Sequence, residues 1–386
     1  MISICIPTKD AGEKFSRNLR AWRDQRTEEE SELVIVDSGS SDATLQTARE
    51  FGARVSSIPA AEFNHGETRN LLARQARGDL LVFTVQDAWP ASNSLLAGLT
   101  RPLRKEPELA GVTGKQIPRP DADFIARWET ENYNRSFDRG YRKKQMRSLS
   151  KFLQGDFLDR FDCLAFENVC SALRRRVWEQ FPFSRIDFAE DLDWSFRVLA
   201  AGHAVVHNPA AQVFHSHNYA PHQRLKRAFV AARALHRIFR MPPEFARLDE
   251  SDVLEGIGAF LADLAEQRAQ LARLPHPVHR PGLPRSARHL LRLGLSRSRI
   301  PGSKRLAQRI RGNQIRDTLR HNFAGAVRSL LKARGPLTPS QAAEAVLQLG
   351  NEQLGDGLGR YAYAKQLEGS LPDWLQEMGA ALSRGV

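Results

Sequence analysis

Short apolar runs alternate with amphipathic stretches over the first 90 residues of the chain. The apolar runs predict four strands, at Ile2–Ile6, Glu32–Val36, Arg54–Ile58 and Asp79–Val85. The stretches between them predict helices, at Glu13–Arg26, Asp42–Phe51 and Gly66–Arg77. Continuous apolar strands separated by helices favour a mostly parallel α/β sheet that is covered on both faces. Ligands of such sheets bind beyond the carboxyl ends of the strands, so the loops that follow these strands are the candidate site.

The pattern changes twice further along the chain. Between residues 92 and 219 it is mixed, with strands predicted at Gly111–Gln116, Ala204–His207 and Gln212–His215. After Tyr219 the strand signals stop, and helices with proline-rich breaks are expected. We therefore expect an α/β domain over residues 1–220 and a basic α-helical region over residues 221–386.

Composition excludes several classes of protein. The chain has 386 residues, 41% of them hydrophobic, which excludes disorder over most of its length. Three cysteines are too few for a disulfide framework, and we expect Cys163 and Cys170 to be buried as apolar side chains. No apolar run approaches the ~20 residues that span a bilayer. Met1 leads directly into a predicted strand, so we expect a cytoplasmic protein, soluble or bound peripherally to a membrane.

The charge of the chain predicts an anionic partner. The formal net charge is +13, which favours nucleic acid, lipid headgroups or a phosphorylated substrate. Residues Arg280–Arg320 contain twelve Lys and Arg against the one acid Asp317, a net charge of +11. His222–Arg240 predicts a basic helix with an apolar stripe from Leu225 to Phe239. Such a helix binds an anionic membrane surface or packs its stripe on the rest of the protein.

Three loops after predicted strands carry candidate binding residues. VDSGSSD places Asp37 where a carboxylate can accept hydrogen bonds from a ribose or a nucleobase. FNHGETRN places Arg69, whose planar fork of donors suits a diphosphate, at the start of a helix. VQDAWP places Asp87, a possible metal ligand, at the end of a strand. Taken alone, each loop is also explained by an ordinary turn, helix cap or surface arginine.

Two downstream motifs carry acids and histidines. FAEDLDW places Glu190, Asp191 and Asp193 at a helix start, where acids suit the helix dipole, but a cap needs only one. With Trp194 beside them, they suggest a cleft in which one carboxylate acts as a general base. VFHSHNY places two histidines on one face of a predicted strand, as a structural pair or as ligands of a divalent metal.

The motifs resemble, as an ordered set over roughly residues 1–220, the inverting family-2 glycosyltransferases of bacterial rhamnosyltransferase type. They are IPTKDAG, VDSGSSD, FNHGETRN, VQDAWP, ENVCSALRRRVWEQFPF, FAEDLDW and VFHSHNY. The resemblance implies a GT-A fold, which is a Rossmann-like α/β fold with a mostly parallel sheet. It implies a nucleotide-diphosphate sugar donor, a divalent metal (Mg or Mn) and inversion at the anomeric carbon. It also implies a glycan or lipid-linked acceptor, in cell-surface polysaccharide synthesis at the inner face of the cytoplasmic membrane.

The resemblance assigns roles to individual residues of this sequence. Those on the donor side are Pro7, Thr8, Asp37 and Gln86 for the nucleotide, and Arg69 for the diphosphate. Those at the reaction centre are Asp87 and His215 as metal ligands, Asp191 as the base, and Glu190, Trp194 and His217 as substrate contacts. The sequence departs from the family at Gln86-Asp87-Ala88, which lacks the second acid of an Asp-x-Asp motif.

Other functions fit parts of the sequence. The first choice of sugar is rhamnose from a thymidine-diphosphate donor, and the second is galactofuranose or another hexose from a uridine-diphosphate donor. A non-catalytic protein that binds sugar nucleotides would share the donor motifs. A nucleic-acid-binding protein would explain the basic segment, but the acids at Glu190–Asp193 would repel phosphates, and the chain carries no nucleic-acid-binding signature. The sequence does not indicate an oligomeric state.

Overall fold

The computed structural model describes residues 1–219, 221–239, 250–272 and 338–369. The chain divides into two compact units. The first comprises residues 1–122 and 129–217, and the second comprises residues 123–128 and the described residues from Asn218 onward. The division predicted at residue 220 lies close to the end of the first unit.

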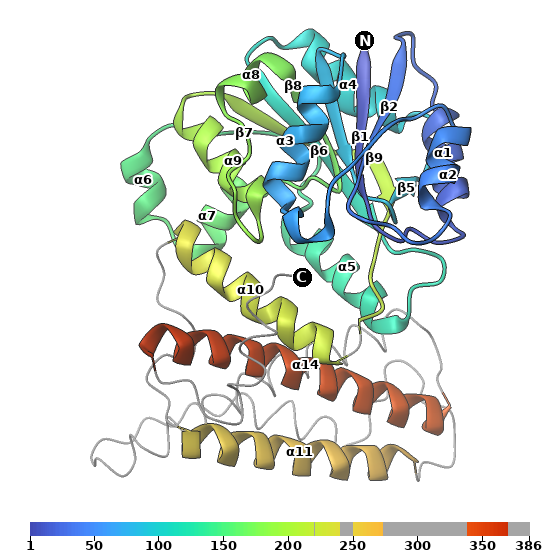
Figure 1. Cartoon of the computed structure of the whole chain (residues 1–386). Helices are drawn as coiled ribbons and strands as arrows, with labels where there is room; N and C mark the ends of the chain where they lie inside the picture. The colour runs from blue at the N-terminus through green and yellow to red at the C-terminus, as the bar shows by residue number, and fades with distance from the viewer. Residues whose placement is uncertain (220, 240–249, 273–337, 370–386) are drawn as a thin grey trace. The chain divides into compact units, whose positions relative to one another are not determined.

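A sheet lies among helices in the first unit (Figure 1). It has nine strands, in the order β3-β2-β1-β4-β8-β6-β9-β5, with β7 also paired to β9. Six strands share one direction: β1 (Ile2–Thr8), β2 (Ser31–Asp37), β3 (Arg54–Ser57), β4 (Leu80–Thr84), β6 (Leu109–Ile117) and β9 (Ala204–Phe214). Three run against them: β5 (Trp89–Pro90), β7 (Arg142–Gln145) and β8 (Cys170–Arg174). The prediction of a mostly parallel α/β sheet is confirmed.

Two details of the sheet differ from the prediction. The strands expected at Ala204–His207 and Gln212–His215 are one continuous strand, β9. Thr113 of β6 pairs with His207, whereas Lys115 pairs with Gln212, so the residues between them bulge without ending the strand. The antiparallel strands were not predicted. β8 enters the sheet between β4 and β6 and brings the segment before it to the carboxyl ends of its neighbours.

Helices pack on the sheet and bury its apolar side chains. They are α1 (Phe15–Arg23), α2 (Thr44–Glu50), α3 (His65–Gln75), α4 (Leu95–Lys105), α7 (Phe157–Leu164), α8 (Arg175–Gln180) and α9 (Glu190–Ala200). The chain also forms α5 (Phe124–Phe137), which begins in the second unit, α6 (Leu149–Gln154) and a short 3-10 turn at Ala60–Glu62. Alternate residues of β1 are buried against the apolar side of α1, including Phe15, Leu19 and Trp22. Asn64 caps α3 by accepting hydrogen bonds from the backbone N–H groups of Gly66 and Glu67. Cys170 is buried as predicted, whereas Cys163 is only partly buried.

The second unit contains three described helices, α10 (Pro221–Phe239), α11 (Glu250–Ala272) and α14 (Pro339–Glu368). Helix α14 packs against both α10 and α11. Gly359 of α14 lies so close to the backbone of α10 that a Cβ there would collide with the carbonyl oxygen of Leu225. This close approach buries Leu225, Phe229 and Phe239.

These contacts favour the second of the two expectations for the stripe, in which it packs on the protein, because Leu225, Phe229 and Phe239 are buried within the second unit. None of the helices that the structure describes is long and apolar enough to cross a bilayer. The basic segment Arg280–Arg320 lies outside the described residues.

Candidate active site

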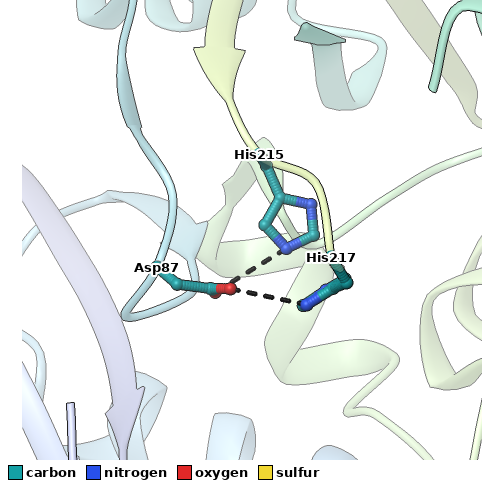
Figure 2. A group of neighbouring side chains, drawn as sticks. All are labelled: Asp87, His215 and His217. Atoms are coloured by element: carbon teal, nitrogen blue, oxygen red, sulfur yellow. Dashed lines mark ion pairs between the residues drawn. The ribbon is translucent and has the colours of Figure 1, made fainter. Parts of the chain in front are cut away.

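Asp87, His215 and His217 form a cluster beyond the carboxyl ends of β4 and β9 (Figure 2). One carboxylate oxygen of Asp87 lies 3.6 Å from Nε2 of His215, and the other lies 3.6 Å from Nδ1 of His217. The three potential ligand atoms are all within 4.8 Å of one another. Strand β9 ends at Phe214, so the histidines lie in the loop after it and not on the strand face that was predicted.

A hydrogen-bond chain orients His215. The amide nitrogen of Gln116 donates to the carboxylate of Glu167, so the amide oxygen of Gln116 faces the imidazole as an acceptor. This oxygen lies 2.6 Å from Nδ1 of His215, which therefore carries the proton. Nε2 then presents its lone pair on the side of Asp87. An outer hydrogen bond of this kind is typical of a metal-binding histidine.

The donor set of the cluster fits a divalent transition metal. Two imidazoles and one carboxylate suit Mn²⁺ better than Mg²⁺, which prefers oxygen ligands and keeps several waters. Asp87 and His215 are the predicted ligands. The structure places His217 with them, although it was predicted as a substrate contact.

Glu190, at the start of α9, is a buried partner of Arg69. The carboxylate lies 3.1 Å from Nη1 of Arg69 and accepts a 3.1 Å hydrogen bond from the side-chain amide of Asn168. Burial alone would raise the pKa of Glu190, but the positive charge of Arg69, with His65 and Asn168, outweighs burial and lowers it. Glu190 is therefore a carboxylate held ionised inside the protein.

Asp191 has the opposite electrostatic environment. Burial and the adjacent negative charge of Glu190 raise its pKa to about 7, against the opposing hydrogen bond from the backbone N–H of Asn168. That bond is 3.2 Å long, and the backbone N–H of Leu192 donates to the other oxygen at 2.9 Å. Ala189, directly before α9, has a left-handed backbone with φ of 63°. A half-buried carboxylate with a pKa near neutrality is suited to general-base catalysis.

Residues Glu167 and Asn168 connect the two clusters. Glu167 holds Gln116 and thereby His215, whereas Asn168 donates to both Asp191 and Glu190. Neither residue, nor Gln116, was predicted in the site. The sequence signal that could have indicated Glu167 and Asn168 is the ENVC motif. This motif is part of the family resemblance, but no role was predicted for its Glu and Asn.

The predicted nucleotide-binding residues hold neighbouring loops together. Asp37 is fully buried and accepts hydrogen bonds from Thr8, the backbone of Gly39, and both the backbone and the hydroxyl of Ser40. Gln86 exchanges two hydrogen bonds with the backbone of Lys9, at 2.7 and 2.9 Å. Pro7, at the end of β1, is half-buried. These contacts hold together the loops at the ends of β1, β2 and β4. That Pro7, Thr8, Asp37 and Gln86 bind a nucleotide stays a prediction.

Two predicted contacts take other positions. Trp194 is 0% exposed and packs its ring against Phe166 and Phe183, so the prediction that it touches substrate is wrong for this structure. Trp194 lies one turn into α9, on the side of the helix that faces the core, where a large apolar ring is most stable. Arg69 is buried against Glu190, so its geometry favours holding α3 to α9 over binding a diphosphate.

The sequence of the chain is similar to those of known glycosyltransferases. The profile of glycosyl transferase family 2 matches residues 3–180. The chain is 32% identical over 233 residues to the O-antigen chain rhamnosyltransferase RfbN of Salmonella typhimurium, covering 59% of this chain and 70% of that protein. It is 31% identical to the O-antigen chain rhamnosyltransferase WbaN of Salmonella anatum, with the same coverage.

Solved structures show a more distant likeness in chain path. The mannosyltransferase PcManGT of Pyrobaculum calidifontis, in complex with GDP-Man and Mn²⁺, is 17% identical, with 82% of this chain and 86% of that chain covered and a TM-score of 0.47. The glucosyl-3-phosphoglycerate synthase of Mycobacterium tuberculosis, in complex with Mn²⁺, uridine diphosphate and product, is 19% identical, with 64% and 83% covered and a TM-score of 0.45.

Proposed function

Because the chain belongs to glycosyltransferase family 2, we propose that it transfers rhamnose from a nucleotide-diphosphate donor to a hydroxyl of a glycan or lipid-linked acceptor. The names of its Salmonella relatives support rhamnose as the sugar and O-antigen synthesis as the setting. The observation that carries the chemistry is the raised pKa of Asp191, about 7, beside the ionised Glu190.

Asp191 acts as the general base in this proposal. It takes the proton of the acceptor hydroxyl while that oxygen forms a bond to the anomeric carbon of the sugar. The bond between the anomeric carbon and the diphosphate oxygen breaks on the opposite face, and its electron pair leaves with the nucleoside diphosphate. One displacement of this kind inverts the anomeric carbon and needs no covalent enzyme intermediate.

Asp87, His215 and His217 would hold a divalent metal, Mg²⁺ or Mn²⁺, and the two imidazoles favour Mn²⁺ of these two. When bound, the metal supplies positive charge that compensates the charge on a diphosphate. Gln116 keeps the proton of His215 on Nδ1, and Glu190 keeps the pKa of Asp191 raised. Thr8, Asp37 and Gln86 shape the loops on which we place the nucleotide.

A donor panel tests this function. The purified chain is mixed with a crude lipid-linked acceptor and with thymidine-diphosphate rhamnose or uridine-diphosphate hexoses, and release of nucleoside diphosphate is measured. We expect release with the rhamnose donor that needs the acceptor and stops with a metal chelator. Release with a uridine-diphosphate hexose alone would correct the sugar, and no release from any donor would contradict the proposal.

We also propose that the enzyme works peripherally at the inner face of the cytoplasmic membrane. The support is the net charge of +11 over Arg280–Arg320, because cations near an anionic leaflet each contribute ~1 kcal/mol to binding. Cosedimentation with anionic and neutral vesicles at low and high salt tests it. We expect salt-sensitive binding to anionic vesicles alone, and equal binding to both kinds would contradict it.

A further inference from the structure

Arg119 follows β6 and lies beside the metal-ligand cluster. Its Nη1 atom is 3.9 Å from a carboxylate oxygen of Asp87, and its side chain is 18% exposed. Its backbone N–H donates a 3.2 Å hydrogen bond to the hydroxyl of Ser216, which stands between the two histidines of the cluster. Both the side chain and the backbone of Arg119 are therefore fixed relative to Asp87, His215 and His217.

Among the residues that the structure describes, Arg119 hydrogen-bonds through one edge of its guanidinium. Nε donates a 3.1 Å hydrogen bond to Asp121, whose other oxygen lies 2.6 Å from the ammonium of Lys14. The separation of 3.9 Å between Nη1 and Asp87 exceeds hydrogen-bond length. The Nη groups of Arg119 thus keep donors that they can offer to an anion bound next to Asp87.

Arg69, the arginine predicted for the diphosphate, is much less accessible to a ligand. Its side chain is 5% exposed, and its charge is matched by the buried carboxylate of Glu190. Pulling Arg69 toward a ligand would leave Glu190 buried without its counter-ion, which is strongly unfavourable. Arg119 is partly open to solvent. The carboxylate near its Nη1 atom is that of Asp87, which would also bind the metal.

Resting on the proposed function, we infer that Arg119 binds the diphosphate of the donor and stabilises the charge of the departing nucleoside diphosphate. When the bond from the anomeric carbon to the diphosphate oxygen breaks, the electron pair stays on that oxygen. A guanidinium fork held in place by Asp121 meets this charge without reorganising, which is the arrangement that contributes most to catalysis.

The test compares Arg119→Gln with the control Arg101→Gln, which changes an exposed arginine of α4. Calorimetry of the full chain measures binding of Mn²⁺ alone, and of thymidine diphosphate and inorganic pyrophosphate in the presence of Mn²⁺. For Arg119→Gln we expect both anions to bind ~10-fold more weakly, since a charge-assisted contact is lost. We expect kcat to fall by ~10²-fold. The control should match the wild type.

Binding of Mn²⁺ alone separates this role from a structural one. Removing a cation that stands beside Asp87 should leave Mn²⁺ affinity unchanged or increased, because like charges repel. A merely structural role would weaken the binding of Mn²⁺ and of the anions together, and that result would overturn the inference. Arg119→Lys, which keeps the charge and loses the fork, should fall between the wild type and Arg119→Gln.

Failure of the inference is distinguishable from failure of the proposed function. If the wild type transfers sugar and Arg119→Gln binds pyrophosphate as tightly as the wild type, Arg119 has no such role and the function stands. If the wild type neither binds thymidine diphosphate nor releases it from any donor, both are wrong.

Discussion

Asp87 and Asp191 are the two acids to which the proposed function gives chemical roles, and their neighbours carry opposite charges. Asp87 lies among groups that carry or can carry positive charge, with His215 and His217 at 3.6 Å and Arg119 at 3.9 Å. Burial raises the pKa of Asp191, and the neighbouring carboxylates of Glu190 and Glu167 raise it further. In the proposed function the same type of side chain therefore binds a cation at Asp87 and accepts a proton at Asp191.

The comparison shows that surroundings, more than residue type, decide what each acid does. Glu190 and Asp191 are consecutive residues, yet Arg69 lowers the pKa of Glu190, whereas burial and the negative charge of Glu190 raise the pKa of Asp191. Asp193, on the same turn, is engaged by the hydroxyl of Ser184 and by Arg197. Among the three acids of this motif, Asp191 therefore combines partial exposure with a pKa near neutrality.

Replacing Asp191 by Asn is expected to have the largest effect on turnover. General-base catalysis contributes ~10²–10⁴-fold, and Asn cannot accept the proton of the acceptor. Nucleoside diphosphate release with donor and acceptor present measures the loss, and Asp193→Asn is the matched control on the same helix. If Asp191→Asn kept more than a tenth of wild-type turnover, another group would be the base.

Glu190→Gln tests the buried negative charge of Glu190, which contributes to the raised pKa of Asp191. It leaves the Arg69 guanidinium buried and unpaired, which costs about 3–5 kcal/mol of unfolding free energy. Urea denaturation measures the change against Glu179→Gln, an exposed glutamate of α8. The double variant Arg69→Met with Glu190→Leu should recover part of the loss, because no buried charge remains. Equal stability of Glu190→Gln and the control would contradict a buried ion pair.

The pH dependence of the wild type should show Asp191 directly. A base must be deprotonated, so kcat/KM should be constant well above pH 7 and fall ~10-fold per pH unit below the pKa of about 7. The negative charge of Glu190 raises that pKa, so Glu190→Gln, where it folds, should shift the fall to lower pH. A profile that stays flat between pH 5 and pH 8 would show that Asp191 does not limit the reaction.

Much of the first unit could be predicted from local sequence. The apolar runs of β1, β2 and β4 are continuous and short, so periodicity alone placed them, and the order of the motifs identified the family. Membership of family 2, together with the sheet order, confirms the predicted GT-A fold. The resemblance joined Asp87 and His215 as metal ligands, and the structure places both in loops after strands of the same direction, β4 and β9.

The remaining features depend on contacts between distant parts of the chain. The pairing of Arg69 with Glu190 joins residues from α3 and α9, and no local pattern distinguishes a buried arginine from one that binds a ligand. Gln116 and Glu167 act through side-chain hydrogen bonds across β6 and the segment before β8. The apolar stripe of α10 was recognised, but its partner α14 begins about a hundred residues later.

Binding of the donor to two variants tests the division of roles most directly. Calorimetry with Mn²⁺ and thymidine-diphosphate rhamnose compares the wild type, Asp191→Asn and Asp87→Ala. The account predicts that Asp191→Asn binds the donor within a few-fold of the wild type, because the base acts on the acceptor. Asp87→Ala should lose the part of the affinity that Mn²⁺ adds. Equal loss of donor binding in both variants, or full Mn²⁺-dependent binding by Asp87→Ala, would contradict it.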